Sequence, residues 1–157
     1  MKIRYIIPGP IGRTDLGTEE LIRRGNKLKE WAFPSTEVDI VAVKKGPASI
    51  ESMYEEYLAI PETAKEVLAA QEAGFDAAIV GCFGDPGLDG IREITDMLVL
   101  GPASASLTLA ATLGHRISIL TVTDSIMGPL RRLVWEAGVL DKLASIRAIN
   151  ISVIDLN

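Results

Sequence analysis

The sequence is poor in residues that mark whole classes of protein. It contains one cysteine and one histidine in 157 residues, and its aromatic residues amount to 5%. A single cysteine cannot close a disulfide inside the chain, and the His, Cys and carboxylate residues show no spacing typical of metal sites. The sequence therefore disfavours a disulfide-stapled secreted protein and a metalloprotein, and we expect a soluble, cytoplasmic chain.

Basic residues and long apolar runs are scarce as well. Lys and Arg number 16 against 21 Asp and Glu, and the longest basic runs are pairs such as Arg23–Arg24. Nucleic acids reward clustered basic residues, so we expect no nucleic-acid partner. No apolar run approaches the roughly 20 residues that span a bilayer, and residues 1–5 lack the features of a signal peptide. We therefore expect no membrane partner.

Apolar residues, in contrast, make up 48% of the chain, enough for a core at this length. They fall into short runs that alternate with amphipathic segments. Several runs are nearly continuous, as in parallel strands that are covered on both faces. The runs predict strands at 3–7, 38–43, 77–82, 97–100, 117–122 and 151–154.

Helix signals lie between these strands. Thr18 is expected to cap a helix at 19–31, and Pro61 to open a helix that ends at Gly74. Two further helices are expected to open at a proline and to end at a glycine, at 102–114 and 129–138. Strands that alternate with helices of this length predict an α/β protein, with a parallel sheet between helices as in Rossmann or flavodoxin-like lobes.

The spacing of the strands predicts two lobes. The first two strands begin about 35 residues apart, and so do the last two. We predict a first α/β lobe at 1–114 and the beginning of a second, similar lobe at 115–157. An unpaired sheet edge in the second lobe also predicts self-association, since proteins usually cover such edges.

The third predicted strand leads into the most informative segment, because chemistry in parallel sheets gathers at the carboxyl ends of strands. Cys82 is expected to face a cleft there, with its pKa lowered by the N-terminus of a helix that Pro86 opens. Backbone N–H groups of Phe83, Gly84 and Asp85 are candidates for binding an anion. The alternatives are that Cys82 is a small buried apolar residue and that Asp85 only caps the helix.

Other candidates weigh less. The turn Pro8-Gly9-Pro10-Ile11-Gly12 follows the first strand but matches neither G-x-G-x-x-G nor G-x-x-x-x-G-K-[ST], so a tight turn is favoured over a nucleotide site. His115 is expected on the surface. Met53, Tyr54 and Tyr57 are expected either to line a pocket or to cover the core.

Three segments resemble a known family. Gly46-Pro47-Ala48-Ser49-Ile50-Glu51-Ser52-Met53-Tyr54 resembles the segment after the second strand of hydantoin racemases. Gly81-Cys82-Phe83-Gly84-Asp85-Pro86-Gly87-Leu88 resembles their first cysteine motif, and Ile117-Ser118-Ile119-Leu120-Thr121 resembles the strand that opens their second lobe. By this resemblance the chain is identified as a hydantoin racemase-like member of the aspartate/glutamate/hydantoin racemase superfamily.

The resemblance implies a cofactor-independent racemase or epimerase of hydantoins or amino acids, with a small molecule as its substrate. Two lobes would face each other across a cleft, each with a cysteine on one face of the substrate. One thiolate removes a proton, and the other thiol returns one to the opposite face. The resemblance assigns Cys82 to catalysis, and it assigns substrate binding to Pro8, Gly9, Phe83, Gly84 and Thr121.

The sequence departs from the family pattern in its loops and in its number of cysteines. Pro8-Gly9-Pro10 stands where asparagine and threonine are common, and Ser104 stands near a common glutamate. The family's second cysteine has no counterpart within residues 1–157, so we expect the chain alone to racemise poorly. The alternatives are a non-catalytic α/β protein that binds a small anion, and a one-thiol lyase or isomerase of the decarboxylase or maleate isomerase type.

Overall fold

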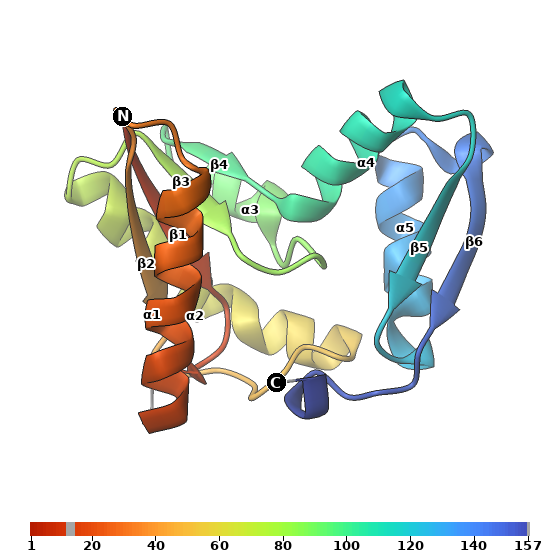
Figure 1. Cartoon of the computed structure of the whole chain (residues 1–157), viewed down its shortest axis with the longest axis horizontal. Helices are drawn as coiled ribbons and strands as arrows, with labels where there is room; N and C mark the ends of the chain where they lie inside the picture. Colours follow the sequence, from red (N-terminus) through yellow and green to blue (C-terminus); the bar gives the residue numbers. More distant parts are fainter. Residues whose placement is uncertain (12–14, 157) are drawn as a thin grey trace.

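The computed structural model describes residues 1–11 and 15–156 of the chain. It contains two parallel sheets joined by one helix, α4 (Pro102–Leu113) (Figure 1). The first sheet has the order β2-β1-β3-β4, and the second sheet pairs β5 with β6. The fold class predicted from the sequence is confirmed. The strands are β1 (Lys2–Ile7), β2 (Glu37–Ala42), β3 (Ala77–Val80), β4 (Leu98–Leu100), β5 (Ile117–Thr121) and β6 (Leu143–Ala148).

Alternation along β1 explains why helices lie on both faces of the first sheet, since successive side chains point to opposite faces. Ile6 is fully buried in a core with Val67 of α2 (Met53–Glu72) and Ile91 of α3 (Leu88–Glu93). Tyr5 points the other way and lies beside Leu28 of α1 (Asp15–Trp31). The first sheet is therefore a layer between α1 on one side and α2 with α3 on the other.

The second sheet has a core of its own. Leu107 of α4 packs there with Ile119 of β5 and with Leu130 and Val134 of α5 (Met127–Glu136). Short 3-10 turns accompany this sheet: η2 (Asp124–Ile126), η3 (Leu140–Lys142) and η4 (Ile154–Leu156).

Helix α4 and the contacts of Glu51 connect the halves at two places. The helix α4 is held at its N-terminus by Asp85 of the first half, and at its C-terminus by Lys142, whose Nζ donates to the Ala111 carbonyl. On the other side, Glu51 accepts hydrogen bonds from the Ser125 hydroxyl and from the Val153 N–H, the latter at 2.7 Å. In Figure 1 these connections lie at opposite ends of the space between the sheets.

The predicted strand at 151–154 is wrong. The second strand of the second sheet begins at Leu143, so the near-repeat in strand spacing disappears. Asn150 has a left-handed backbone (φ 56°), and beyond it the chain turns away from the sheet into η4.

Helix starts are the other corrections. The helix expected from Pro61 begins at Met53, because Ser52 and Glu55 form a capping box, and Pro61 lies inside the helix. Thr18 lies within α1 and not at its start, and α5 begins two residues before Pro129. The helix expected at Pro86 begins at Leu88, whereas the helix at Pro102 and its end at Gly114 are confirmed. Among the described residues, no helix has the length and apolar character needed to span a membrane.

Candidate active site

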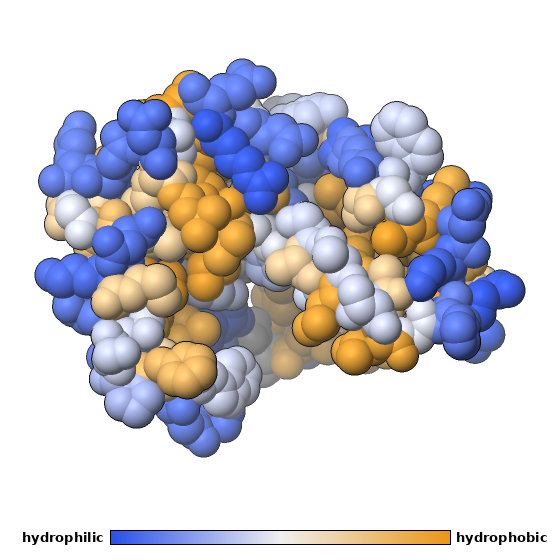
Figure 2. Space-filling model, turned by 90° about the horizontal axis from the view of Figure 1, so that it is seen from above, coloured by the Kyte–Doolittle hydropathy of each residue, from blue (hydrophilic) through white to orange (hydrophobic). Residues whose placement is uncertain are grey.

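A cleft of about 410 Å³ lies between the two sheets, and Figure 2 shows the molecule hollowed between its halves. We call it the thiol cleft because Cys82 lines it. Its volume suits a small molecule. Most of its wall is apolar, and the polar or ionisable side chains in it are Ser52, Glu56, Cys82 and Thr121.

The strand expected at 77–82 ends at Val80, so Cys82 is the second residue after the carboxyl end of this central strand, and its thiol is free and half-buried. The Gly84 N–H donates to its Sγ at 3.5 Å, and the Asp85 N–H donates to its carbonyl at 3.0 Å. The Tyr5 ring supports the strand end, because it occupies the space where a Cβ on residue 81 would lie, with its Cε1 only 2.3 Å away. Only glycine fits at position 81, so the contact between Gly81 and Tyr5 fixes the position of the backbone at Cys82.

The pKa of Cys82 is raised, against the prediction from the sequence. Burial is the main cause, the Gly84 N–H opposes it in part, and the carboxylates of Glu56 and Asp85 raise the pKa further. The helix expected to lower the pKa begins only at Leu88 and is six residues long. Cys82 is therefore a neutral thiol at rest, which suits it to donate a proton.

Four of the six residues singled out from the sequence share this cleft. Cys82, Phe83 and Gly84 come from the loop after β3, and the buried Thr121 comes from the end of β5. The site therefore draws on both sheets, although the two strands lie far apart in the sequence.

Pro8 and Gly9 do not line the thiol cleft. Both are buried, and the Ile11 N–H donates to the Gly9 carbonyl at 2.9 Å, as in a tight turn. A Cβ on Gly9 would lie 3.3 Å from the Pro47 carbonyl oxygen, so this turn packs against the loop after β2. His115 is exposed, as expected.

Asp85 does not cap the helix that follows it. Its carboxylate reaches the start of α4 instead, where Oδ1 accepts from the Ala103 N–H at 2.9 Å and Oδ2 from the Ser104 N–H at 2.8 Å. Asp85 is buried and has a left-handed backbone (φ 47°). It ties the loop that carries Cys82 to the helix between the sheets.

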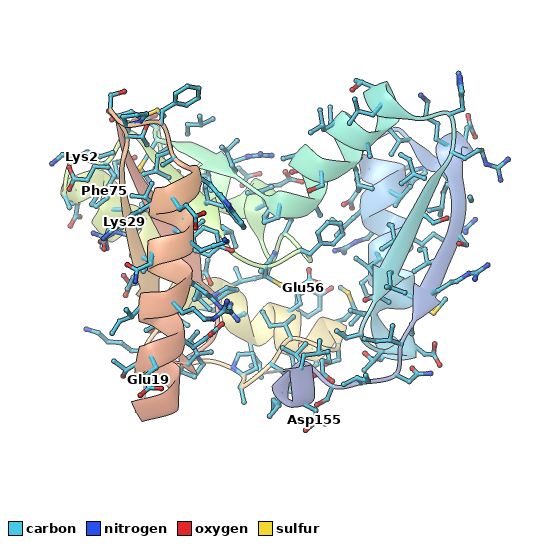
Figure 3. All side chains as sticks on the ribbon, in the orientation of Figure 1. Lys2, Glu19, Lys29, Glu56, Phe75 and Asp155 are labelled. Atoms are coloured by element: carbon cyan, nitrogen blue, oxygen red, sulfur yellow. The ribbon has the colours of Figure 1, made fainter. Side chains whose placement is uncertain are left out.

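Glu56 is the residue of the site that sequence reasoning missed. It is 6% exposed, and its Oε1 lies 3.3 Å from Nη2 of Arg132 on α5. Burial raises the pKa of Glu56, Arg132 opposes this, and the carboxylates of Glu136 and Asp85 reinforce it. In Figure 3 Glu56 lies between α2 and the loop after β3. A signal was available, since the buried positions of α2 follow one helical stripe: Glu56, Ala59, Thr63, Val67 and Ala70.

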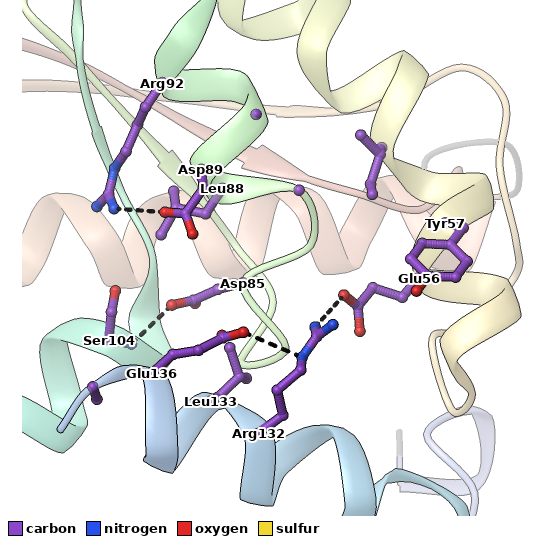
Figure 4. Close-up of a pocket in the computed structure, with 14 residues that line it drawn as sticks. Glu56, Tyr57, Asp85, Leu88, Asp89, Arg92, Ser104, Arg132, Leu133 and Glu136 are labelled. Carbon is purple, nitrogen blue, oxygen red and sulfur yellow. Dashed lines mark hydrogen bonds and ion pairs between the residues drawn. The ribbon is translucent and has the colours of Figure 1, made fainter. Parts of the chain in front are cut away.

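A second pocket, of about 350 Å³, adjoins the thiol cleft and shares Glu56 and Leu133 with it (Figure 4). Arg132 crosses between them, because it pairs with Glu56 and, through Nε at 3.5 Å, with Glu136. Tyr57 lines this second pocket. Within residues 1–11 and 15–156, no group of three His, Cys, Asp or Glu side chains is arranged to hold a metal ion.

Comparison with known proteins identifies relatives of this arrangement. The family model described as Asp/Glu/Hydantoin racemase matches residues 17–157. A hydantoin racemase of Pseudomonas sp. (strain NS671) is 39% identical over 155 residues, which cover 99% of this chain and 60% of that protein. A hydantoin racemase of Paenarthrobacter aurescens is 36% identical over 119 residues, which cover 75% of this chain and 50% of that protein.

Solved structures agree. The allantoin racemase from Klebsiella pneumoniae is 31% identical with a TM-score of 0.89, and the match covers 99% of this chain and 61% of that one. An arylmalonate decarboxylase variant, at 18% identity and a TM-score of 0.62, shares the fold. The chain thus spans about half to 60% of the length of these racemases. Since the family model matches nearly all of the chain, it belongs to the Asp/Glu/hydantoin racemase family.

Proposed function

We propose that this chain supplies one side of the active site of a cofactor-independent racemase of hydantoins or amino acids. The observation that carries the proposal is the shared cleft: the thiol of Cys82 and the hydroxyl-bearing Thr121 line it from opposite sheets. A substrate in this cleft contacts both halves of the molecule at once.

The chemistry needs a proton donor, anion stabilisation and a base. The thiol of Cys82 gives its proton to the carbanion carbon of the substrate. The N–H groups of Phe83 and Gly84 stabilise the negative charge on a substrate carbonyl, because N–H donors in a dry cleft favour a developing oxyanion. The Gly84 N–H does so in place of its bond to the Cys82 Sγ. The Phe83 N–H has no acceptor within residues 1–11 and 15–156, so it is available for this role.

A second proton-transfer group is needed on the opposite face, since a single base returns the proton to the side it came from. The chain contains one cysteine. We place the second group in the part of the racemases' length that this chain does not span.

The lining of the thiol cleft indicates which substituents the substrate carries. Ile126, Leu130, Leu133 and Ile149 give it an apolar wall. A hydantoin with an apolar substituent at carbon 5 buries that substituent against this wall, whereas a charged amino acid side chain would lose its hydration there. The proposal therefore favours 5-alkyl or 5-benzyl hydantoins over charged amino acids.

The test is chiral chromatography of a 5-substituted hydantoin incubated with two proteins. One is the 157-residue chain, and the other is a chimera in which the Pseudomonas relative's residues beyond the match continue the chain after Asn157. We expect racemisation from the chimera and very little from the chain alone, because each positioned acid or base contributes about 10²- to 10⁴-fold. Cys82→Ser should abolish the activity of the chimera. Unchanged activity after that substitution would refute the mechanism.

Self-association and cellular location are proposals as well. We propose that the chain self-associates, because no further strand pairs with β5 or β6 in the described part and Leu120 of β5 is 72% exposed. Light scattering after size exclusion should give at least a dimer, and a monomer of 16.9 kDa at micromolar concentration would count against this. We also propose a cytoplasmic location, which cell fractionation would check.

A further inference from the structure

Glu56 and Cys82 line the same cleft from different elements, Glu56 from the first turn of α2 and Cys82 from the loop after β3. Among the side chains that the structure describes, the buried charged ones are those of Glu56 and Asp85. A buried carboxylate is costly unless a partner compensates its charge, and Arg132 is the partner here. A carboxylate in this place acts on the thiol through the poorly screened interior of the cleft.

The ionisable groups around Cys82 are acidic. Cys82 faces the carboxylates of Glu56 and Asp85 and the phenol of Tyr5. Glu56 faces Arg132 and Glu136 from α5, Asp85 from the loop after β3, and Cys82 itself. The carboxylate of Asp85 is engaged by two N–H groups of α4, and Arg132 is partly exposed and shared with Glu136. Glu56 is therefore the carboxylate that lines the thiol cleft beside Cys82.

We propose that Glu56 is a positioning residue of the racemase reaction, whose buried carboxylate adds to the burial of Cys82 in holding it as the neutral thiol, so that this half of the site starts each cycle as the acid. The inference rests on the function proposed above. In the first step a base on the far face takes the proton from the substrate carbon, and the electron pair stays on that carbon. Cys82 then gives its S–H proton to the near face of the carbon and is left as a thiolate.

The negative charge of Glu56 also favours the return of Cys82 to its protonated form. A thiolate beside Glu56 is unfavourable, so Cys82 takes up a proton again while the far base loses the one it gained. Protons and charge balance over the cycle. Glu56 does not touch the reacting atoms in this scheme and acts only through the protonation of Cys82.

The test uses the 157-residue chain, in which Cys82 is the only thiol. Its alkylation by iodoacetamide, a neutral reagent, is followed against pH, and the apparent pKa is taken from the midpoint of the profile. We expect Glu56→Gln to lower this pKa by about one unit, which gives about tenfold more thiolate at a pH below the midpoint. Glu56→Asp keeps the charge and should keep the pKa close to that of the unchanged chain.

The matched control is Glu136→Gln. Glu136 also pairs with Arg132 but does not line the thiol cleft, so we expect no measurable shift. Glu56→Met is the second neutral variant, and circular dichroism checks the fold of each. An unchanged or higher pKa in a folded Glu56→Gln or Glu56→Met chain overturns the inference, as does an equal shift in Glu136→Gln.

This experiment needs no substrate, so its outcome is separate from that of the racemisation assay. An inactive chimera together with the expected pKa shift refutes the proposed function and leaves the electrostatic role of Glu56. An active chimera without the shift refutes only the role of Glu56.

Discussion

The contact between Asp85 and Gly101 gives the sharpest stability prediction. The Asp85 carboxylate accepts two N–H groups at the start of α4, and a Cβ on residue 101 would lie 2.3 Å from its Cγ. Gly101 has an extended backbone (φ −115°), so glycine is required there by space and not by conformation. The carboxylate thus fills the gap that Gly101 leaves.

The magnitude follows from the bonds lost. Hydrogen bonds to charged groups contribute about 1.5–3 kcal/mol each, and a helix cap about 0.5–2 kcal/mol. Asp85→Gly removes both bonds without backbone strain, because glycine accepts the left-handed conformation (φ 47°). We expect it to lower the free energy of unfolding by about 2–4 kcal/mol. Asp85→Asn keeps one acceptor and should cost about half of that. Asp89→Asn is the control, since Asp89 is exposed and should cost under about 0.5 kcal/mol.

The assay is urea unfolding followed by circular dichroism, arranged as a double-mutant cycle. Gly101→Ala should cost about 1–3 kcal/mol in the unchanged chain, because it overpacks a filled space. In the Asp85→Gly background the same substitution should cost under about 0.5 kcal/mol, because the clash is gone. An equal cost of Gly101→Ala in both backgrounds would refute the assignment of this contact.

Three further predictions are independent of that contact. Ser52→Ala should cost about 1 kcal/mol in the same unfolding assay, because it removes the capping box of α2; no loss would contradict that role. Ile6→Ala should cost about 2–5 kcal/mol because Ile6 is fully buried, whereas Ile22→Ala, at 59% exposed, should stay within about 0.5 kcal/mol. Hydrogen bonds from Arg23 and Arg24 lower the pKa of Glu20 to about 2, so its stabilising contribution is complete above the ordinary value of 4.5 and is lost as the pH falls through about 2. An NMR titration should give that pKa and show it rise in Arg24→Gln; a value near 4.5 in the unchanged chain would contradict the pairing.

The sequence predicted the first sheet well because each of its strands is an apolar run between two turns. Ile6 and Val80 lie in such runs, and both are fully buried. The place of Cys82 was predictable for the same reason, since a residue directly after a parallel strand lies at its carboxyl end. The run at 151–154 shows the limit of this reasoning. It is apolar as well, but its Val153 N–H binds the Glu51 carboxylate, a partner 102 residues earlier, and not a neighbouring strand.

The protonation of Cys82 could not be predicted from its neighbours in the sequence. The helix start at Pro86 pointed to a lowered pKa, but burial raises the pKa of Cys82, and the carboxylates of Glu56 and Asp85 add to that rise. Glu56 reaches the cleft only because α2 begins at Met53. The sequence predicted a helix start at Pro61, which left Glu56 outside the helix. A local motif thus predicted the position of the thiol, and tertiary packing determined its charge.

The contacts of Glu51 determine what must break when the cleft opens. Together with α4 they close a ring around the space between the sheets, so the halves cannot separate on that side unless the bonds to Glu51 from the Ser125 hydroxyl and from the Val153 N–H break. Opening of the cleft then exposes this amide to solvent, whereas the amides of β1 stay paired to their neighbouring strands. Hydrogen exchange at Val153 therefore reports the opening equilibrium of the cleft, separately from global unfolding.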